Sequence, residues 1–131
     1  MVIIPITEPV LSVDEFYNPK IYKNAEAVMV LLTRLILLNP GTIQSHPDMG
    51  VGLVKNYRYS VEGSEFELRG AIIENIQKFL PKFQGASVAV ELKDKAYYIS
   101  ITIDDTVFMV FYDTKNNTDV VKTQYTRLNE L

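Results

Sequence analysis

The chain has 131 residues, of which 47% are hydrophobic and 22% charged, and it contains no Cys. This length and composition suit one domain with its own hydrophobic core. The formal net charge of -3 argues against nucleic acid or acidic lipid as the main partner, because phosphate binding needs a basic surface. The absence of Cys excludes disulfides and thiolate chemistry.

Residues 1–23 read as an extended arm that precedes a single folded domain, residues 24–131. Pro5, Pro9 and Pro19 disfavour a helix there, because proline lacks a backbone N–H. The arm is nevertheless too apolar for a free linker, so it packs either on its own domain or on a partner subunit. It has no basic region typical of a signal peptide, and we expect the chain to be made as a soluble cytoplasmic protein.

The pattern over residues 25–38 predicts a nearly all-apolar helix that forms the centre of the core. Val28, Leu32 and Leu35 recur at helical spacing, and Asn24 is a suitable N-cap. The helix is shorter than the roughly 20 apolar residues that a membrane span needs. It ends at Asn39-Pro40-Gly41, since proline disfavours helical geometry at the residue before it.

The loop that follows contains His46, the single histidine of the chain. One histidine without Cys or a second histidine makes a poor metal site, because zinc needs three or four protein ligands. Gly41, Gly50 and Gly52 lack the Gly-Lys-Ser/Thr ending of a phosphate-binding loop. We interpret them as turn residues and expect Pro47 to stiffen the loop.

Residues 54–63 are polar and aromatic and are expected at the surface. Ser64 and Glu67 have the spacing of a capping box, in which each side chain satisfies a first-turn backbone donor. They begin a second, amphipathic helix over residues 65–80 that Pro81 ends.

The last third of the chain predicts strands at residues 88–92, 97–103, 107–112 and 120–126. Asp104 and Asp105 form a hairpin turn in which Asp105 tolerates positive φ. Residues 120–126 lack a strong apolar face, which is typical of an edge strand. The fold class is therefore α+β, with two main helices packed on a small antiparallel sheet of three to four strands.

The carboxylates offer little for catalysis. Glycoside hydrolysis needs two carboxyl groups in different environments, whereas turn residues are solvated and ionised. The candidates weighed are Asp104, Asp105, Glu62, Glu65 and Glu67. Because none is placed in a buried environment, we expect no enzyme, and we expect no cofactor or metal.

Two stretches resemble a known family. Leu37-Leu38-Asn39-Pro40-Gly41 is followed by His46-Pro47-Asp48-Met49-Gly50-Val51-Gly52-Leu53, and a capped helix and strands come after them. This order, over about residues 25–112, resembles the baseplate-wedge and tail-sheath-initiator family of contractile phage tails and type VI-like injection systems. Leu80-Pro81-Lys82 stands where that family carries Glu-Pro-Arg, so the positive charge is kept and the carboxylate is lost.

The resemblance implies a structural protein of the virion tail baseplate, assembled in the host cytoplasm. Its partners would be other wedge proteins and the tail-sheath protein, with several copies per sixfold baseplate and no nucleic acid or direct membrane contact. The family implies contacts to the wedge core at Pro47, Gly50, Gly52, Pro81 and Lys82. It implies a strand edge for the first sheath subunits at Val107, Met109, Phe111, Val120, Lys122 and Gln124. Main-chain hydrogen bonds would supply the affinity.

The sequence leaves two alternative functions open. Bacterial anti-adaptors that shield a sigma factor from proteolysis resemble the same family, which suggests a regulatory binding protein. The other alternative is the weak glycosidase interpretation of the carboxylates.

Overall fold

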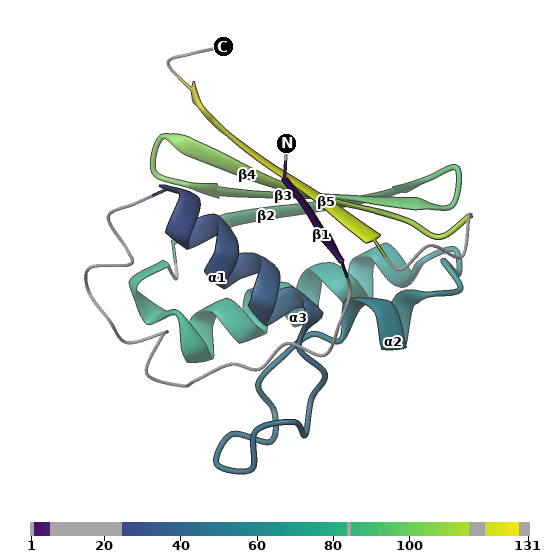
Figure 1. The fold of residues 1–131 in the computed structure, drawn as a ribbon, viewed down its shortest axis with the longest axis horizontal. Helices are drawn as coiled ribbons and strands as arrows, with labels where there is room; N and C mark the ends of the chain where they lie inside the picture. The colour runs from purple at the N-terminus through teal and green to yellow at the C-terminus, as the bar shows by residue number, and fades with distance from the viewer. Residues whose placement is uncertain (1, 6–24, 84, 116–119, 129–131) are drawn as a thin grey trace.

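The computed structural model describes residues 2–5, 25–83, 85–115 and 120–128. Within these residues the chain forms three α-helices and a five-stranded antiparallel sheet, which confirms the α+β prediction (Figure 1). The elements are β1 (Val2–Pro5), α1 (Ala25–Leu37), α2 (Leu53–Tyr57), α3 (Ser64–Phe79), β2 (Ser87–Lys93), β3 (Ala96–Ile103), β4 (Thr106–Asp113) and β5 (Val120–Arg127), with a 3₁₀ turn at Pro81–Phe83.

The sheet has the strand order β1-β5-β4-β3-β2, so four strands follow one another along the chain. Asp94 and Lys95 connect β2 to β3, and both have positive φ (54° and 61°), as in a type I′ hairpin turn. The turn from β3 to β4 is also present as predicted, but its positive φ of 53° falls on Asp104 rather than Asp105. A short aspartate side chain tolerates this left-handed conformation at either position.

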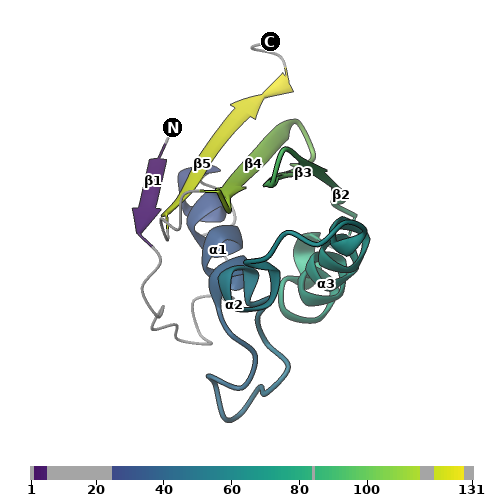
Figure 2. The same ribbon diagram turned by 90° about the vertical axis from the view of Figure 1, so that its right-hand side faces the viewer.

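All three helices lie on one side of the sheet (Figure 2). Leu32, Leu35 and Ile36 of α1 are each 1% exposed, because the helix packs on β4 and β5 of the sheet and against α2. On the sheet, Tyr97, Ile99, Ile101, Phe108 and Val110 are buried beneath the helices. The central helix and the strand alternation are thus confirmed, and they produce one helix layer on one sheet layer.

The start of α3 differs from the prediction. The helix begins at Ser64, its N-cap is Gly63 in a left-handed conformation, and no side chain caps it. The Ser64 hydroxyl instead lies 2.5 Å from the Val61 carbonyl and 2.6 Å from the Tyr97 hydroxyl. The reciprocal cap with Glu67 is therefore wrong: the Ser64 side chain joins the helix to the sheet.

The expectation that residues 54–63 lie at the surface is wrong for their first part. These residues contribute to α2, in which Leu53, Val54 and Tyr57 are buried. The Tyr57 ring meets the Tyr97 ring edge-on at 6.1 Å. Burial raises the pKa of Tyr57 to about 12. A five-residue helix is too short to show a clear period in the sequence.

The N-terminal arm is described only in part. Val2–Pro5 forms β1, which pairs antiparallel with β5 of the same chain. The Asn24 cap and the remainder of the predicted arm lie outside the described residues. Among the helices that are described, none has the length and apolar character to cross a membrane.

Candidate functional site

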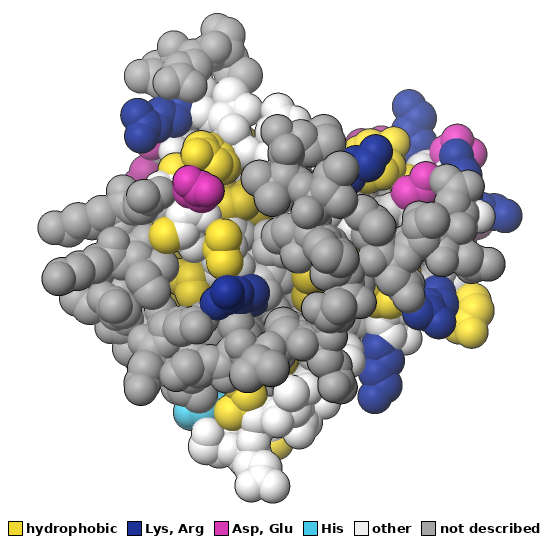
Figure 3. Space-filling model, viewed as in Figure 1, with side chains coloured by type: hydrophobic (Ala, Val, Ile, Leu, Met, Phe, Trp, Pro, Cys, Tyr) yellow, Lys and Arg dark blue, Asp and Glu magenta, His cyan; other side chains and the backbone are white. Residues whose placement is uncertain are grey.

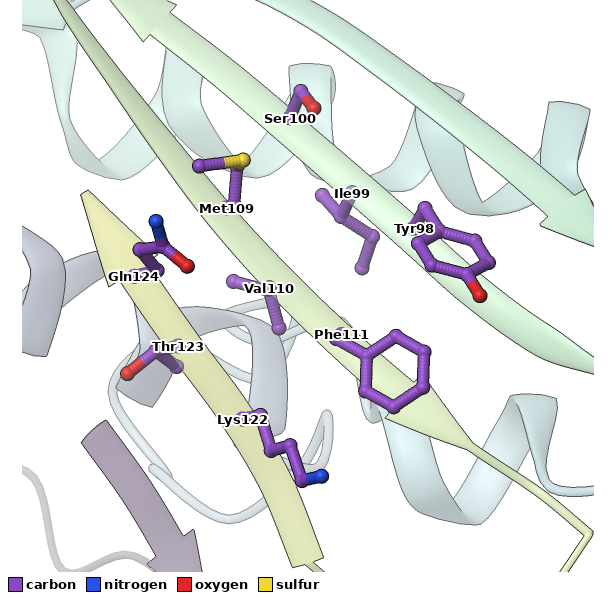
Figure 4. Close-up of a pocket in the computed structure, with 9 residues that line it drawn as sticks. All are labelled: Tyr98, Ile99, Ser100, Met109, Val110, Phe111, Lys122, Thr123 and Gln124. Carbon is purple, nitrogen blue, oxygen red and sulfur yellow. The ribbon is translucent and has the colours of Figure 1, made fainter. Parts of the chain in front are cut away.

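The face of the sheet opposite the helices carries an apolar hollow of about 270 Å³. Figure 4 shows Tyr98 and Ser100 of β3, Met109 and Phe111 of β4, and Lys122 and Gln124 of β5 around it, with the helices behind the strands. Tyr98 is 44% exposed, and Met109 and Phe111 are half-buried. Large apolar side chains left partly open on one sheet face are typical of a partner-binding surface.

Aromatic rings contact each other and a lysine in this hollow. The Tyr98 and Phe111 ring centroids are 5.1 Å apart, and the Lys122 ammonium lies 5.8 Å from the centre of the Phe111 ring. Phe111 pairs with Lys122 across the strands, and Met109 pairs with Gln124. The structure therefore brings four of the predicted sheath-binding residues together on one face.

Two other predicted sheath-binding residues lie away from the hollow. Val107 is half-buried further along β4 and shares its face with Met109, because strand residues two apart point the same way. Val120 is described through its backbone, which pairs with Pro5 of β1.

The prediction that β4 offers a strand edge is wrong. β4 pairs with β3 on one side and with β5 on the other, so the backbone groups of Val107, Met109 and Phe111 face neighbouring strands. These residues can contribute side chains to a binding surface but cannot bond an added strand.

β5 is also less open than the sequence suggested. β1 covers its outer side from Val120 to Thr123, and the pairing of these described residues stops there. Val121 and Thr123 are 0% and 1% exposed, so β5 has a buried face after all. The remaining residues of β5, from Gln124 to Arg127, extend beyond β1.

At the opposite edge of the sheet, a side chain engages one backbone carbonyl of β2. Arg69 of α3 donates from its Nε to the Val88 carbonyl over 2.7 Å. This bond occupies an outward-facing carbonyl that could otherwise pair with another strand. The β2 edge is therefore blocked at Val88, near its start.

The second candidate surface is the loop between α1 and α2, which projects away from the sheet (Figure 1). The last residues of the loop, just before α2, return to the end of α1. The Val51 N–H bonds the Leu35 carbonyl at 3.1 Å, and the Gly52 N–H bonds the Leu38 carbonyl at 2.9 Å. These bonds satisfy carbonyls at the helix end that have no partner within the helix. The loop is thus fixed at its base.

A buried amide of α3 also holds the loop. The Gly50 N–H donates to the Asn75 Oδ1 over 2.7 Å, and the Asn75 Nδ2 lies 3.4 Å from the Gly50 carbonyl. Gly50 has a φ of 112°, and a Cβ placed on it would lie 2.2 Å from the Leu38 carbonyl oxygen. Gly50 and Gly52 are buried, so they shape the loop rather than contact a partner directly.

Most exposed side chains in the outer part of the loop are uncharged. Thr42, Gln44, Ser45 and Pro47 are exposed, and the projecting end of the molecule is largely white in the space-filling view (Figure 3). Pro47 accepts a hydrogen bond from the Gly41 N–H at 2.8 Å, which closes the loop. Of the predicted loop residues, Pro47 is the one that a partner can reach.

His46 packs against α3. Its ring meets the Phe79 ring edge-on at 5.8 Å. Nearby, Lys78 bonds Asp48, and this hydrogen bond lowers the pKa of the exposed Asp48 carboxyl. No group of three His, Cys, Asp or Glu side chains that could hold a metal ion occurs among the described residues.

Pro81 and Lys82 lie exposed at the end of α3, where a partner can reach them. Leu80, which precedes them, is 0% exposed, and the Phe83 N–H bonds its carbonyl at 2.8 Å. Leu80 therefore belongs to the core.

The carboxylates considered for catalysis are not gathered at one place. Asp104 and Asp105 are exposed at a turn between strands, whereas Glu62, Glu65 and Glu67 lie at the start of α3 and just before it. Glu65 is half-buried and the others are exposed. The described structure does not pair a buried acid with an ionised one.

Three residues that matter in the structure were not singled out in the sequence. Asn75 interrupts the apolar stripe of α3, and an amide in such a stripe is a signal of a buried hydrogen bond. Tyr98 is a large aromatic among the polar residues of its strand face, which signals an exposed apolar surface. No local pattern identifies Arg69, whose partner lies on another element.

No protein-family model, curated protein or solved structure matches this chain.

Proposed function

We propose that this protein is a structural wedge component of a contractile-tail baseplate, and that it starts tail-sheath assembly by offering the β5 edge to a strand of the sheath protein. The observation that carries the proposal is the uncovered part of the β5 edge. β1 covers only Val120 to Thr123 of the eight residues of β5, and at the other edge of the sheet Arg69 blocks the Val88 carbonyl of β2. The family resemblance of the loop between α1 and α2 supplies the kind of partner.

Strand addition at this edge would use two kinds of contact. The backbone of β5 supplies hydrogen bonds, which give affinity with little demand on the partner's sequence. The hollow beside it supplies apolar contact through Met109 and Phe111, next to Lys122 and Gln124. A sheath subunit that adds a strand to β5 can also cover this face.

The wedge partners are assigned to the opposite end of the molecule. The loop tip with Pro47 and the α3 end with Pro81 and Lys82 are exposed and lie on the helix side of the sheet. Gly50 and Gly52 act indirectly, because they hold the loop in place. In this arrangement the helix layer faces the baseplate and the β5 edge faces the sheath, in several copies around a sixfold baseplate of the virion.

The test is co-expression with candidate sheath and wedge proteins from the same genome, followed by pull-down and electron microscopy. We expect ordered sheath to grow from complexes that contain this chain. Lys122→Glu should weaken sheath capture, whereas Lys82→Glu should weaken capture of the wedge proteins only. Failure to capture either protein would contradict the proposal and would favour a regulatory binding function.

A further inference from the structure

We propose that the sheath strand replaces β1 on β5, and that it carries an acidic residue between two apolar residues opposite Val121, Lys122 and Thr123. The inference rests on the proposed function, and it adds the register, the chemistry of the incoming strand and the segment that must leave.

The hydrogen-bonding direction of each β5 residue follows from one contact. The Leu128 N–H bonds the Asp105 carbonyl at 2.6 Å. Bonded and non-bonded pairs alternate in an antiparallel ladder, so Gln124 and Lys122 direct their backbone groups toward Met109 and Phe111 of β4. The backbone groups of the residues between them point to the outer edge: Val121, Thr123, Tyr125 and Arg127.

β1 uses only part of this edge. Val2 pairs with Thr123 and Ile4 with Val121, whereas Tyr125 and Arg127 lie beyond the last described pair. β1 has four residues and β5 has eight, so a longer strand can make every bond that β1 makes and add those at Tyr125 and Arg127. β1 and the longer strand compete for the same backbone groups.

Pro5 is the last residue of β1, the outermost strand on this side of the sheet. In the same alternation Pro5 and Val120 form a non-bonded pair, so the backbone nitrogen of Pro5 points away from β5. Proline has no N–H to offer there, so the outer edge of β1 lacks one hydrogen-bond donor. While β1 is in place, its outer edge is a poorer template for a further strand than the β5 edge beneath it.

The β5 side chains define the incoming strand. Val121 and Thr123 are buried on the helix side of the sheet, and α1 packs against β5, so the residues opposite them must be apolar. Lys122 points to the other face and lies over the Phe111 ring. Its pair across the outer edge is a non-bonded one, which brings the side chains close together.

Charge selects the residue opposite Lys122. β5 has the sequence VVKTQYTR, with two cations and no carboxylate. A carboxylate opposite Lys122 forms an oppositely charged cross-strand pair, whereas a cation there is repelled. The partner is therefore an extended segment of alternating pattern, apolar–acidic–apolar.

A disulfide between β1 and β5 tests the exchange in the full chain, which has no native Cys. Pro5→Cys combined with Val120→Cys places two thiols on a directly opposed pair and keeps Lys122 unchanged. Non-bonded antiparallel pairs have Cα atoms about 4.5 Å apart, which a disulfide can bridge. We expect the oxidised variant to lose sheath binding by about tenfold or more relative to its reduced form.

The matched control is Ser87→Cys with Thr102→Cys, which joins β2 to β3 at another directly opposed pair, away from the sheath-binding residues. Its oxidation should leave sheath binding unchanged, because these strands stay paired throughout. If the oxidised β1–β5 variant bound sheath as well as its reduced form, the exchange would be refuted and the proposed function would stand. If the wild-type chain bound no sheath protein, the proposed function would fail together with the exchange.

The charge requirement has its own test. Lys122→Glu should weaken sheath binding by roughly tenfold, and reversing the paired carboxylate of the sheath strand to Lys should restore it. Lys55→Glu makes the same charge change at an exposed site on α2 and should have no effect on sheath binding. Equal effects of the two variants would contradict the acidic residue in the incoming strand.

Discussion

The two faces of the sheet use apolar side chains differently. On the helix side, Phe108 and Val110 are 2% and 1% exposed beneath α1 and α3. On the opposite side, Met109 and Phe111 alternate with them along the same strand but remain half-buried, and no described element covers them (Figure 2). The first set stabilises the fold, whereas the second set is available to a partner.

The difference predicts which substitutions affect folding and which affect binding. A change on the helix side should lower the free energy of unfolding, because it leaves a cavity or a buried polar group. A change on the open side should leave folding nearly intact and act on assembly. The following experiments test this division, from the largest expected effect to the smallest.

Leu35→Asp should prevent stable folding. Leu35 is 1% exposed in α1, and a charge buried there without a partner costs more than about 4 kcal/mol. Val30→Asp is the matched control on the same helix, because Val30 is 36% exposed and its carboxylate would reach water. Thermal melting followed by circular dichroism compares the two. A cooperative melt near that of the wild type for Leu35→Asp would contradict the position of the core.

Phe108→Ser and Phe111→Ser compare the two faces on one strand. Truncation at the buried Phe108 should cost roughly 4 kcal/mol, and truncation at the half-buried Phe111 about 1 kcal/mol. Denaturant unfolding gives both values. Sheath capture should be weakened by Phe111→Ser even though the variant is folded. Equal losses of stability would show that the open face is covered in the free protein.

Gly50→Ala should destabilise the helix layer by roughly 3 kcal/mol, because its Cβ would clash with the Leu38 carbonyl oxygen at a strained φ. Gly41→Ala also places an alanine at a positive φ, here 90°, but nothing lies within 4 Å of the added carbon. It should cost about 1 kcal/mol. The difference between the two variants isolates the close approach of the loop to α1, and similar costs would argue against it.

Tyr57 makes the stability of the helix layer depend on pH. Its pKa is raised to about 12 by burial, whereas an unfolded tyrosine ionises near its ordinary value of 10.0. The folded state therefore binds more protons between these values, and stability present below pH 10 should fall by roughly 2 kcal/mol as the pH rises to 12. Tyr57→Phe should reduce this loss. Tyr59→Phe should not, because Tyr59 is 83% exposed.

The sequence was sufficient for the elements that have long, regular patterns. The apolar period of residues 25–38 predicted α1, and the alternation around Ile99 and Ile101 predicted β3. α2 was missed because its five residues show no clear period. The capping box was wrong because tertiary contact with Tyr97 engages the Ser64 hydroxyl.

The candidate site was predicted in its residues but not in its geometry. Met109, Phe111, Lys122 and Gln124 were named for a strand edge, and they share one sheet face. Their assignment to an edge failed at β4, because strand order depends on pairing between distant segments. The position of β1 beside β5 joins the two ends of the chain, and no local pattern records such a contact.

Amide hydrogen exchange across β5, with and without sheath protein, tests the central claim most directly. In the free chain the amides of Gln124 and Thr126 face β4 and should exchange slowly, whereas those of Tyr125 and Arg127 face the outer edge and should exchange fast. When sheath protein binds, the account predicts that Tyr125 and Arg127 become as protected as their neighbours. Bound sheath protein with unchanged exchange at these two amides would contradict strand addition at β5.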